Sequence, residues 1–198
     1  MHLVLASNNP GKLRELTQLL APLGYTLTPQ DALGIEPACE TGTTFLENAL
    51  LKARHAAQQA LLPALADDSG LEVDALGGRP GVYSARFAGE AASDADNLHK
   101  LLAELRDVPT ERRQARYQCV IVLVHAREDR EPLIAQGTWE GEITSAPHGT
   151  HGFGYDPIFV PAGLGLTAAE LPPAQKNALS HRAQALHALV AMLEAPGV

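Results

Sequence analysis

Two adjacent acids, Asp67 and Asp68, follow a short apolar run in the segment ALADDSG. Neighbouring side chains of an extended chain point in opposite directions, so only one of the two acids can face a given ligand. Glu40, in the loop before a predicted helix, offers a second carboxylate, and Mg²⁺ prefers oxygen ligands, several of them water. A tight turn through Ser69 and Gly70 is the alternative, since these residue types favour turns. The segment therefore allows a magnesium site or a turn.

The segment from Ser7 to Lys12, SNNPGK, lies between a predicted strand at 2–6 and a predicted helix near 11–21. The N–H groups at a helix N-terminus carry about half a positive charge and can bind an anion. Gly11 allows a close backbone approach, and Lys12 adds a full charge. The pattern is not GxxxxGK[ST], so it is not a P-loop. A plain turn built from Asn, Pro and Gly remains the alternative.

A glycine-rich loop with two aromatic residues, GTHGFGYDP, precedes a predicted strand at 158–160. Its N–H groups and the rings of Phe153 and Tyr155 suit a planar ligand, and an irregular connection between strands is the alternative. His148 and His151 lie in or beside this loop. No Cys or acidic partner stands at zinc-ligand spacing from them, so a metal site there is disfavoured.

The last predicted helix, at 173–194, carries a group of donors near its start. Lys176, His181 and Arg182 lie away from its apolar stripe. Such charges usually mark a solvated helix face. A ligand site and a solvated face both remain open from these residues alone.

Hydrophobic periodicity predicts the elements that position these groups. A capping box of Thr44 and Glu47 starts one helix, which Pro63 ends, and Ser93 or Asp94 caps another. Because strands and helices are interspersed but several strands are consecutive, the pattern predicts an α/β fold with a mixed sheet. The expected strands are 2–6, 25–28, 64–66, 71–76, 115–126, 132–145 and 158–160, and the expected helices are 11–21, 45–62, 93–105 and 173–194.

Composition limits the class of protein. A chain of 198 residues with 45% hydrophobic residues predicts one domain, 1–198, with a substantial core. The net charge of -8 argues against binding a nucleic acid polymer, although a small phosphorylated ligand remains possible. Cys39 and Cys119 form no disulfide framework. Neither a signal peptide nor a run of about 20 apolar residues is visible, so we expect no membrane association and a cytoplasmic location.

Together, SNNPGK, ETGTTFLENALLKARHAA, ADDSGLEVDALGGRPGVYSARFAGE, GFGYDPIF and SHRAQAL resemble the inosine/xanthosine triphosphate pyrophosphatase family along nearly the whole chain. The resemblance implies Mg²⁺-dependent hydrolysis of dITP, ITP and XTP to the nucleoside monophosphate and pyrophosphate, which cleanses the nucleotide pool. It also implies a homodimer and an elongated mixed sheet flanked by helices, with a nucleotide cleft between two lobes. One departure is His151, where the family usually has Gly. A left-handed backbone there would be strained, although His tolerates it better than most residues.

The resemblance also implies roles for individual residues. Glu40 and Asp68 resemble the metal carboxylates, and Asp68 also resembles the general base. Lys52 resembles a further lysine near the phosphates, and Ser69 resembles a substrate contact. The triphosphate loop would comprise Ser7, Asn8, Asn9, Pro10, Gly11 and Lys12, and the nucleotide and base contacts would be Phe153, Gly154, Tyr155, Asp156, Lys176, His181 and Arg182. We expect His181 and Arg182 to donate to purine O6, and Phe153 or Tyr155 to stack on the base.

Two other functions fit parts of the sequence. A Maf-type nucleotide pyrophosphatase also opens with a strand and a polar loop, but its loop usually carries Ser-Pro-Arg where this chain has Asn-Pro-Gly-Lys. A non-catalytic module that senses purine nucleotides belongs to a different class. The presence of both Glu40 and Asp68 favours catalysis over sensing.

Overall fold

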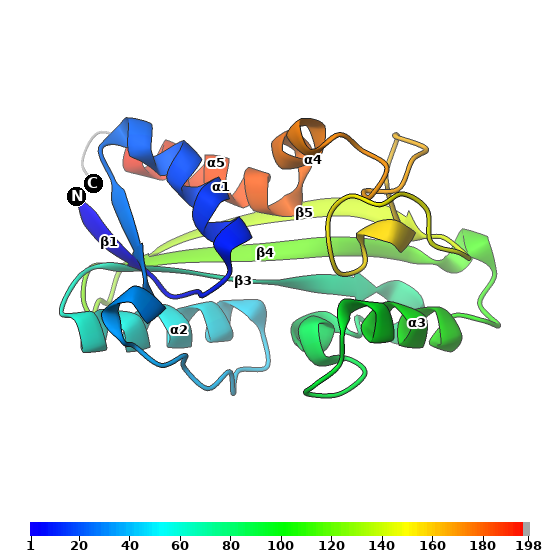
Figure 1. Ribbon diagram of the computed structural model, residues 1–198, viewed down its shortest axis with the longest axis horizontal. Helices are drawn as coiled ribbons and strands as arrows, with labels where there is room; N and C mark the ends of the chain where they lie inside the picture. The colour runs from blue at the N-terminus through cyan, green and yellow to red at the C-terminus, as the bar shows by residue number, and fades with distance from the viewer. Residues whose placement is uncertain (196–198) are drawn as a thin grey trace. The chain divides into compact units, whose positions relative to one another are not determined.

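The computed structural model describes residues 1–195 of the chain, and within them it forms one mixed six-stranded sheet in the order β2-β1-β3-β4-β5-β6 (Figure 1). β1 runs parallel to β2 and β3, and β5 runs antiparallel to β6. The strands are β1 (His2–Leu5), β2 (Thr26–Pro29), β3 (Ala64–Val73), β4 (Gln114–Val124), β5 (Leu133–Ile143) and β6 (Phe159–Pro161). The predicted mixed α/β class is confirmed.

The helices begin and end close to the predicted positions, except for the helix expected at 173–194. They are α1 (Pro10–Leu20), α2 (Phe45–Ala60), α3 (Asp94–Glu104), α4 (Pro173–Leu179) and α5 (His181–Leu193). Short 3-10 turns cover Ala21–Leu23, Gln30–Leu33, Asp74–Leu76, Gly81–Arg86, Thr110–Arg112 and Asp156–Ile158. No helix among residues 1–195 is long and apolar enough to cross a membrane.

Both predicted helix caps are present. The Thr44 hydroxyl accepts a hydrogen bond from the Glu47 N–H at 3.1 Å, and a Glu47 carboxylate oxygen accepts one from the Thr44 N–H at 3.2 Å. Ser93 and Asp96 form a second capping box at the start of α3. These reciprocal bonds satisfy N–H groups that have no partner inside the helix, which is why the sequence marks both helix starts well.

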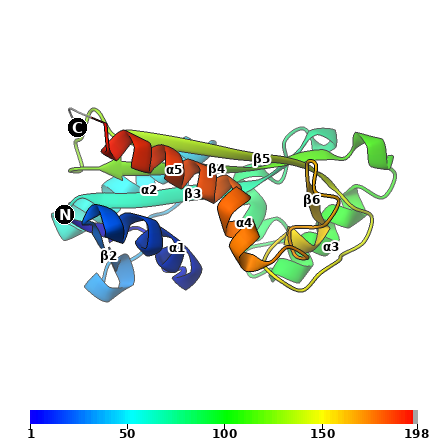
Figure 2. The same cartoon turned by 90° about the horizontal axis from the view of Figure 1, so that it is seen from above.

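The chain divides into two compact units, each with its own core. Unit 1 contains Met1–Asp68, Cys119–Gly137 and the chain from Arg182 onward, and unit 2 contains Ser69–Gln118 and Thr138–His181. In unit 1, α1 and α5 cover one face of the strands and α2 covers the other (Figures 1 and 2). The core of unit 2 joins α3 to β4, β5 and β6 through buried residues that include Leu101, Trp139 and Phe159.

The structure contradicts three predicted boundaries. The strand expected at 71–76 ends at Val73, where the 3-10 turn Asp74–Leu76 begins. The turn at 67–70, which the sequence left open as an alternative, is absent, because β3 continues without interruption from Ala64 to Val73. β1 pairs with β3 only at Ala64 and Leu65, so residues 67–70 continue the strand beside β4, and their place in the sheet outweighs the turn preference of Asp, Ser and Gly. The expected helix at 173–194 is two helices, because Ser180 adopts an extended backbone with ψ 159° between α4 and α5.

Candidate active site

β3 directs its two adjacent acids toward different partners in unit 1. Asp67 is buried, with 1% of its side chain exposed, and its Oδ2 lies 2.8 Å from Lys12 Nζ and 3.5 Å from Arg182 Nε. Burial alone raises the pKa of Asp67, but the charges of Lys12, Arg182 and Lys52 outweigh it and hold the pKa well below its usual range. Asp67 is therefore a buried anion that anchors two of the predicted substrate-binding cations.

Asp68 lies in a second cluster with Glu40 and Lys52. The Lys52 ammonium donates to Asp68 Oδ1 at 2.7 Å and to Glu40 Oε1 at 2.9 Å. Burial raises the pKa of Asp68 and outweighs the opposing effect of Lys52. Burial alone lowers the pKa of Lys52, but the surrounding carboxylates outweigh it and raise that pKa. The loop before α2 and strand β3 thus bring the two predicted metal carboxylates to one ammonium group.

The Glu40 and Asp68 pair suits a hard cation. Asp68 Oδ2 is buried, and the Asn48 side chain is the neighbouring donor that acts on this carboxylate besides Lys52. Mg²⁺ that acts on phosphates typically takes one or two carboxylates and fills its other positions with water and phosphate oxygens. Across residues 1–195 no group of three or more His, Cys, Asp or Glu side chains could hold a metal ion. These carboxylates therefore fit a Mg²⁺ ion that shares its ligands with a substrate.

The loop from Ser7 to Lys12 is organised by its own hydrogen bonds. Asn9 caps α1, since its Oδ1 accepts from the Gly11 N–H at 2.8 Å and from the Lys12 N–H at 3.2 Å. The Asn9 N–H in turn donates to Ser7 Oγ at 3.2 Å. Two of the N–H groups that were expected to face an anion thus face Asn9. The Lys12 side chain is the charged group that this loop offers to a ligand.

A pocket of about 200 Å³ in unit 1 brings the separate segments together. Its lining includes two lysines, Lys12 and Lys52, and two acids, Glu40 and Asp67. The full set of lining residues is Ala6, Ser7, Asn8, Lys12, Gln30, Pro37, Ala38, Glu40, Lys52 and Asp67. The predicted phosphate loop, one predicted metal carboxylate and the predicted second lysine therefore share one hollow.

In unit 2, Asp156 organises the glycine-rich loop. Asp156 is 3% exposed, and its Oδ2 accepts a hydrogen bond from the Phe153 N–H at 2.8 Å and contacts Lys176 Nζ. Its Oδ1 accepts a longer bond, 3.4 Å, from the Tyr117 hydroxyl. Gly152 has a φ of +76°, and a Cβ atom there would collide with the Asp156 carboxylate. The buried Asp156 carboxylate thus fixes the backbone of the glycine-rich loop at Gly152 and Phe153.

The rings of unit 2 differ in exposure. Phe153 is 54% exposed, and Lys176 Nζ lies 4.8 Å from its ring centroid. Tyr155 is 4% exposed and its hydroxyl donates to the Ser84 carbonyl at 2.8 Å, so its ring belongs to the core. Of the two aromatic residues predicted to stack on a base, Phe153 is the one with an exposed face. The Gly154 N–H donates to Asp94 Oδ2 at 2.8 Å.

His181 and Arg182 do not form a solvated helix face. His181 is 7% exposed and stacks on Tyr117 with ring centroids 4.7 Å apart and an interplanar angle of 8°. Arg182 is 6% exposed and lies against Asp67. His151, whose backbone was in question, is not among the described non-glycine residues with positive φ, so its replacement of Gly strains nothing there.

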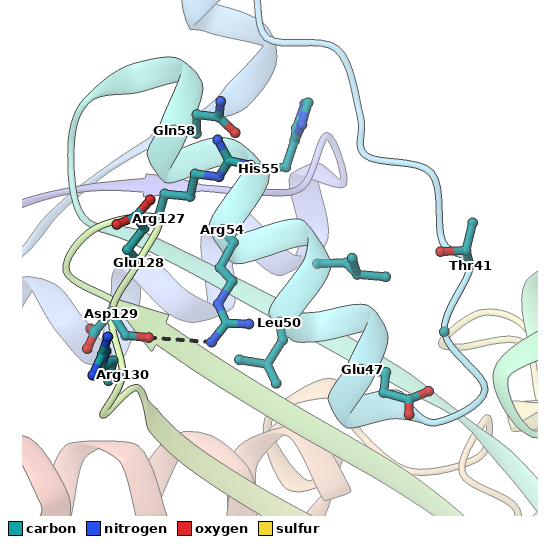
Figure 3. Close-up of a pocket in the computed structure, with 12 residues that line it drawn as sticks. Thr41, Glu47, Leu50, Arg54, His55, Gln58, Arg127, Glu128, Asp129 and Arg130 are labelled. Atoms are coloured by element: carbon teal, nitrogen blue, oxygen red, sulfur yellow. Dashed lines mark hydrogen bonds between the residues drawn. The ribbon is translucent and has the colours of Figure 1, made fainter.

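A larger cavity of about 1060 Å³ lies elsewhere in unit 1, along α2 and the 127–130 loop (Figure 3). Arg54 Nη2 donates to the Asp129 carbonyl at 3.4 Å across part of it. Three arginines and three acids line it, so the charge of its wall is mixed. The cavity contains none of the residues predicted to bind substrate or metal.

Sequence reasoning missed three residues that the geometry brings to these sites. Asp67 was noticed only as the neighbour of Asp68, and Gln30 and Tyr117 were not noticed at all. Asp67 could have been suspected from the alternation of an extended chain. No local pattern marks the other two, because their contacts depend on distant segments.

Comparisons with known proteins agree with this architecture. Residues 3–192 match the model of the Ham1 family. A dITP/XTP pyrophosphatase from Methylococcus capsulatus is 60% identical over 98% of this chain and 96% of that protein, and one from Vibrio cholerae is 53% identical over 97% and 96%.

Solved structures give the same result. A HAM1 protein from Coxiella burnetii aligns with a TM-score of 0.94 at 49% identity and covers 98% of this chain and 100% of that one. The Ham1 protein of Staphylococcus aureus aligns with a TM-score of 0.89 at 42% identity and covers 98% of each chain. The resemblance and the fold class predicted from the sequence are confirmed, and the chain belongs to the Ham1 family.

Proposed function

We propose that this protein hydrolyses non-standard purine nucleoside triphosphates (dITP, ITP and XTP) to the monophosphate and pyrophosphate, with Mg²⁺ as cofactor. The observation that carries the proposal is the placement of Asp68 and Glu40 on the Lys52 ammonium group, within the same unit as Lys12. The names of the relatives from Methylococcus capsulatus and Vibrio cholerae support the substrate class.

Charge balance explains why lysines and carboxylates occur together in unit 1. A triphosphate brings about four negative charges, which a metal ion and nearby cations must offset. Glu40 and Asp68 would hold Mg²⁺, which would polarise a phosphoryl oxygen and neutralise developing charge. Lys12 and Lys52 supply the fixed positive charge, and their carboxylate partners hold them in the pocket before substrate arrives.

Asp68 would act as the general base. Its pKa is raised by burial, which makes it a better proton acceptor than an exposed aspartate. Lys52 bonds Oδ1 and fixes the carboxylate, which would take the proton from the attacking water. A positioned base of this kind contributes about 10²–10⁴-fold to the rate. Lys52 is therefore expected to orient the base as well as to neutralise phosphate.

Base selection would depend on Phe153, His181 and Arg182. The exposed Phe153 ring offers a stacking face, and stacking by itself does not distinguish purines. Purine O6 accepts a hydrogen bond in hypoxanthine and xanthine, whereas adenine carries an amino group there. A site that donates to O6 leaves its donor unpaired with adenine, and such sites can discriminate by about 10⁴–10⁵.

The test is pyrophosphate release from a panel of ITP, XTP, dITP, GTP and ATP, with and without Mg²⁺. We expect turnover of the first three with Mg²⁺ and a loss of about 10²–10⁴-fold in Asp68→Asn. Asp107→Asn, an exposed acid away from the pocket, is the matched control. Wild-type turnover that survives Asp68→Asn unchanged would contradict the assignment of the base.

Discrimination has its own test. The ratio of kcat/KM for ITP to that for ATP should fall in Arg182→Ala, and an unchanged ratio would exclude Arg182 as an O6 donor. If wild type and Asp68→Asn both bind ITP and neither hydrolyses it, the protein is a nucleotide sensor instead.

The assembly and location of the protein complete the proposal. We infer a homodimer from the family resemblance. Sedimentation velocity measures the oligomeric state directly. We infer a cytoplasmic location because Cys39 and Cys119 are both free thiols, as a reducing compartment favours. A monomer in solution would contradict the first inference, and a periplasmic fraction would contradict the second.

A further inference from the structure

Gln30 is a buried polar residue that lines the pocket of about 200 Å³ in unit 1, and the proposed reaction does not use it. It begins the 3-10 turn Gln30–Leu33 directly after β2 and is 4% exposed. It lines the pocket of about 200 Å³ together with Asn8, Lys12 and Lys52. Its backbone carbonyl accepts a hydrogen bond from the Ile35 N–H at 3.0 Å, which fixes the turn.

The side chain of Gln30 differs from the charged groups around it. Lys12 is paired with Asp67, and Lys52 is paired with Glu40 and Asp68. By contrast, the Gln30 amide takes part in no hydrogen bond with another residue of the described part of the chain. The Gln30 amide is not among the buried polar atoms that lack a partner, so it reaches the space of the pocket, where water or a ligand can form a hydrogen bond with it. The placement of Gln30 in a pocket therefore points to a ligand.

The chemistry of the pocket identifies the kind of ligand. A glutamine amide has two N–H donors, and phosphate oxygens are acceptors. An uncharged donor adds a hydrogen bond without disturbing the balance between the two lysines and two carboxylates that line the pocket. The volume of about 200 Å³ is below the 300–1,000 Å³ usual for whole drug-sized ligands, so it suits phosphate groups and not a nucleoside.

We propose that the Gln30 amide donates a hydrogen bond to the part of the triphosphate that leaves as pyrophosphate, and that Gln30 is a further phosphate-binding residue of this enzyme. The proposal rests on the proposed function for its substrate. Its test measures binding alone, so it does not depend on turnover. The probes are inorganic pyrophosphate and IMP, each titrated calorimetrically into the full-length protein with Mg²⁺.

Gln30→Met is the main variant, because methionine keeps the length of the side chain and removes both donors. We expect the Kd for pyrophosphate to rise about 3–10-fold, as the loss of one neutral hydrogen bond implies, while the Kd for IMP stays within about twofold. Gln30→Glu places a negative charge beside the phosphates and should weaken pyrophosphate binding more than Gln30→Met does. Gln58→Met, an exposed residue of α2, is the control and should change neither value.

The outcomes separate the possibilities. A pyrophosphate Kd within about twofold of wild type in Gln30→Met would overturn the proposal, and so would equal weakening of pyrophosphate and IMP, which indicates a structural role. If Gln30→Met does not fold, Gln30→Asn serves instead, because its amide is one methylene shorter, and the same selective loss is expected. If Gln30→Met selectively weakens pyrophosphate binding but the wild-type protein does not hydrolyse ITP, the role of Gln30 in phosphate binding is supported and the proposed function is refuted.

Discussion

The Lys12–Asp67 pair gives the sharpest prediction about the nucleotide-free protein. Asp67 has 1% of its side chain exposed and lies 2.8 Å from Lys12 Nζ, which is 19% exposed. Removing one partner of a buried ion pair typically costs about 3–5 kcal/mol, because it leaves the other charge uncompensated. Since Lys12 can still reach water, we expect Asp67→Asn to lose about 3 kcal/mol in the free energy of unfolding. For a chain of this size that lowers Tm by about 6–12 °C.

A double-mutant cycle isolates the pair from other effects. Lys12→Met and the double variant Lys12→Met/Asp67→Asn are measured by urea unfolding beside the single variants, without nucleotide or metal. We expect a coupling energy of about 2 kcal/mol, because the double variant removes both charges together. Asp74→Asn is the control, since Asp74 pairs with Arg116 on the surface and such pairs contribute about 0–1 kcal/mol.

Two results would refute this reasoning. Additivity of the two single variants to within about 0.5 kcal/mol would show that Lys12 and Asp67 do not interact energetically. A loss below about 1 kcal/mol in Asp67→Asn would show that water compensates both Lys12 and Arg182 for the missing carboxylate. Either result would remove the basis for describing Asp67 as the anchor of the phosphate-binding lysine.

The other predictions concern unit 2 and the capping of α2. Gly152→Ala should raise KM for ITP about tenfold or more, because a Cβ at φ +76° collides with the Asp156 carboxylate; an unchanged KM would show that the loop tolerates the shift. Tyr117→Leu should reduce the ratio of kcat/KM for ITP to that for ATP, whereas Tyr117→Phe, which keeps the ring that stacks on His181, should not; equal effects would exclude the stack as the cause. Thr44→Ala should cost about 1 kcal/mol in urea unfolding with kcat unchanged, because it removes only the helix cap.

Local patterns were sufficient for much of the fold. The capping boxes at Thr44 and Ser93 determine helix starts because their hydrogen bonds join residues three apart in the sequence. The alternation of an extended chain determines that Asp67 and Asp68 face different partners. Likewise the mixed sheet follows from the order of strands and helices. Each of these depends on neighbouring residues, so the sequence alone contains the information.

Contacts between segments far apart in the sequence decided the course of β3 and the exposure of the two aromatic residues. Turn-forming residues after Asp68 lie within a continuous strand because β3 stays in the sheet beside β4, and this outweighs their local preference. Tyr155 looked available for stacking, but packing against Ser84 buries it, and only Phe153 keeps an exposed face.

The charge partners of the candidate site show the same division most clearly. Lys12 meets Asp67, and Asp67 meets Arg182, across segments that no periodicity links. The sequence by itself determined which residue types this protein has for holding phosphate, metal and base. The tertiary structure decided which acid anchors a lysine and which residues line the same pocket, because burial and distance depend on how remote segments pack.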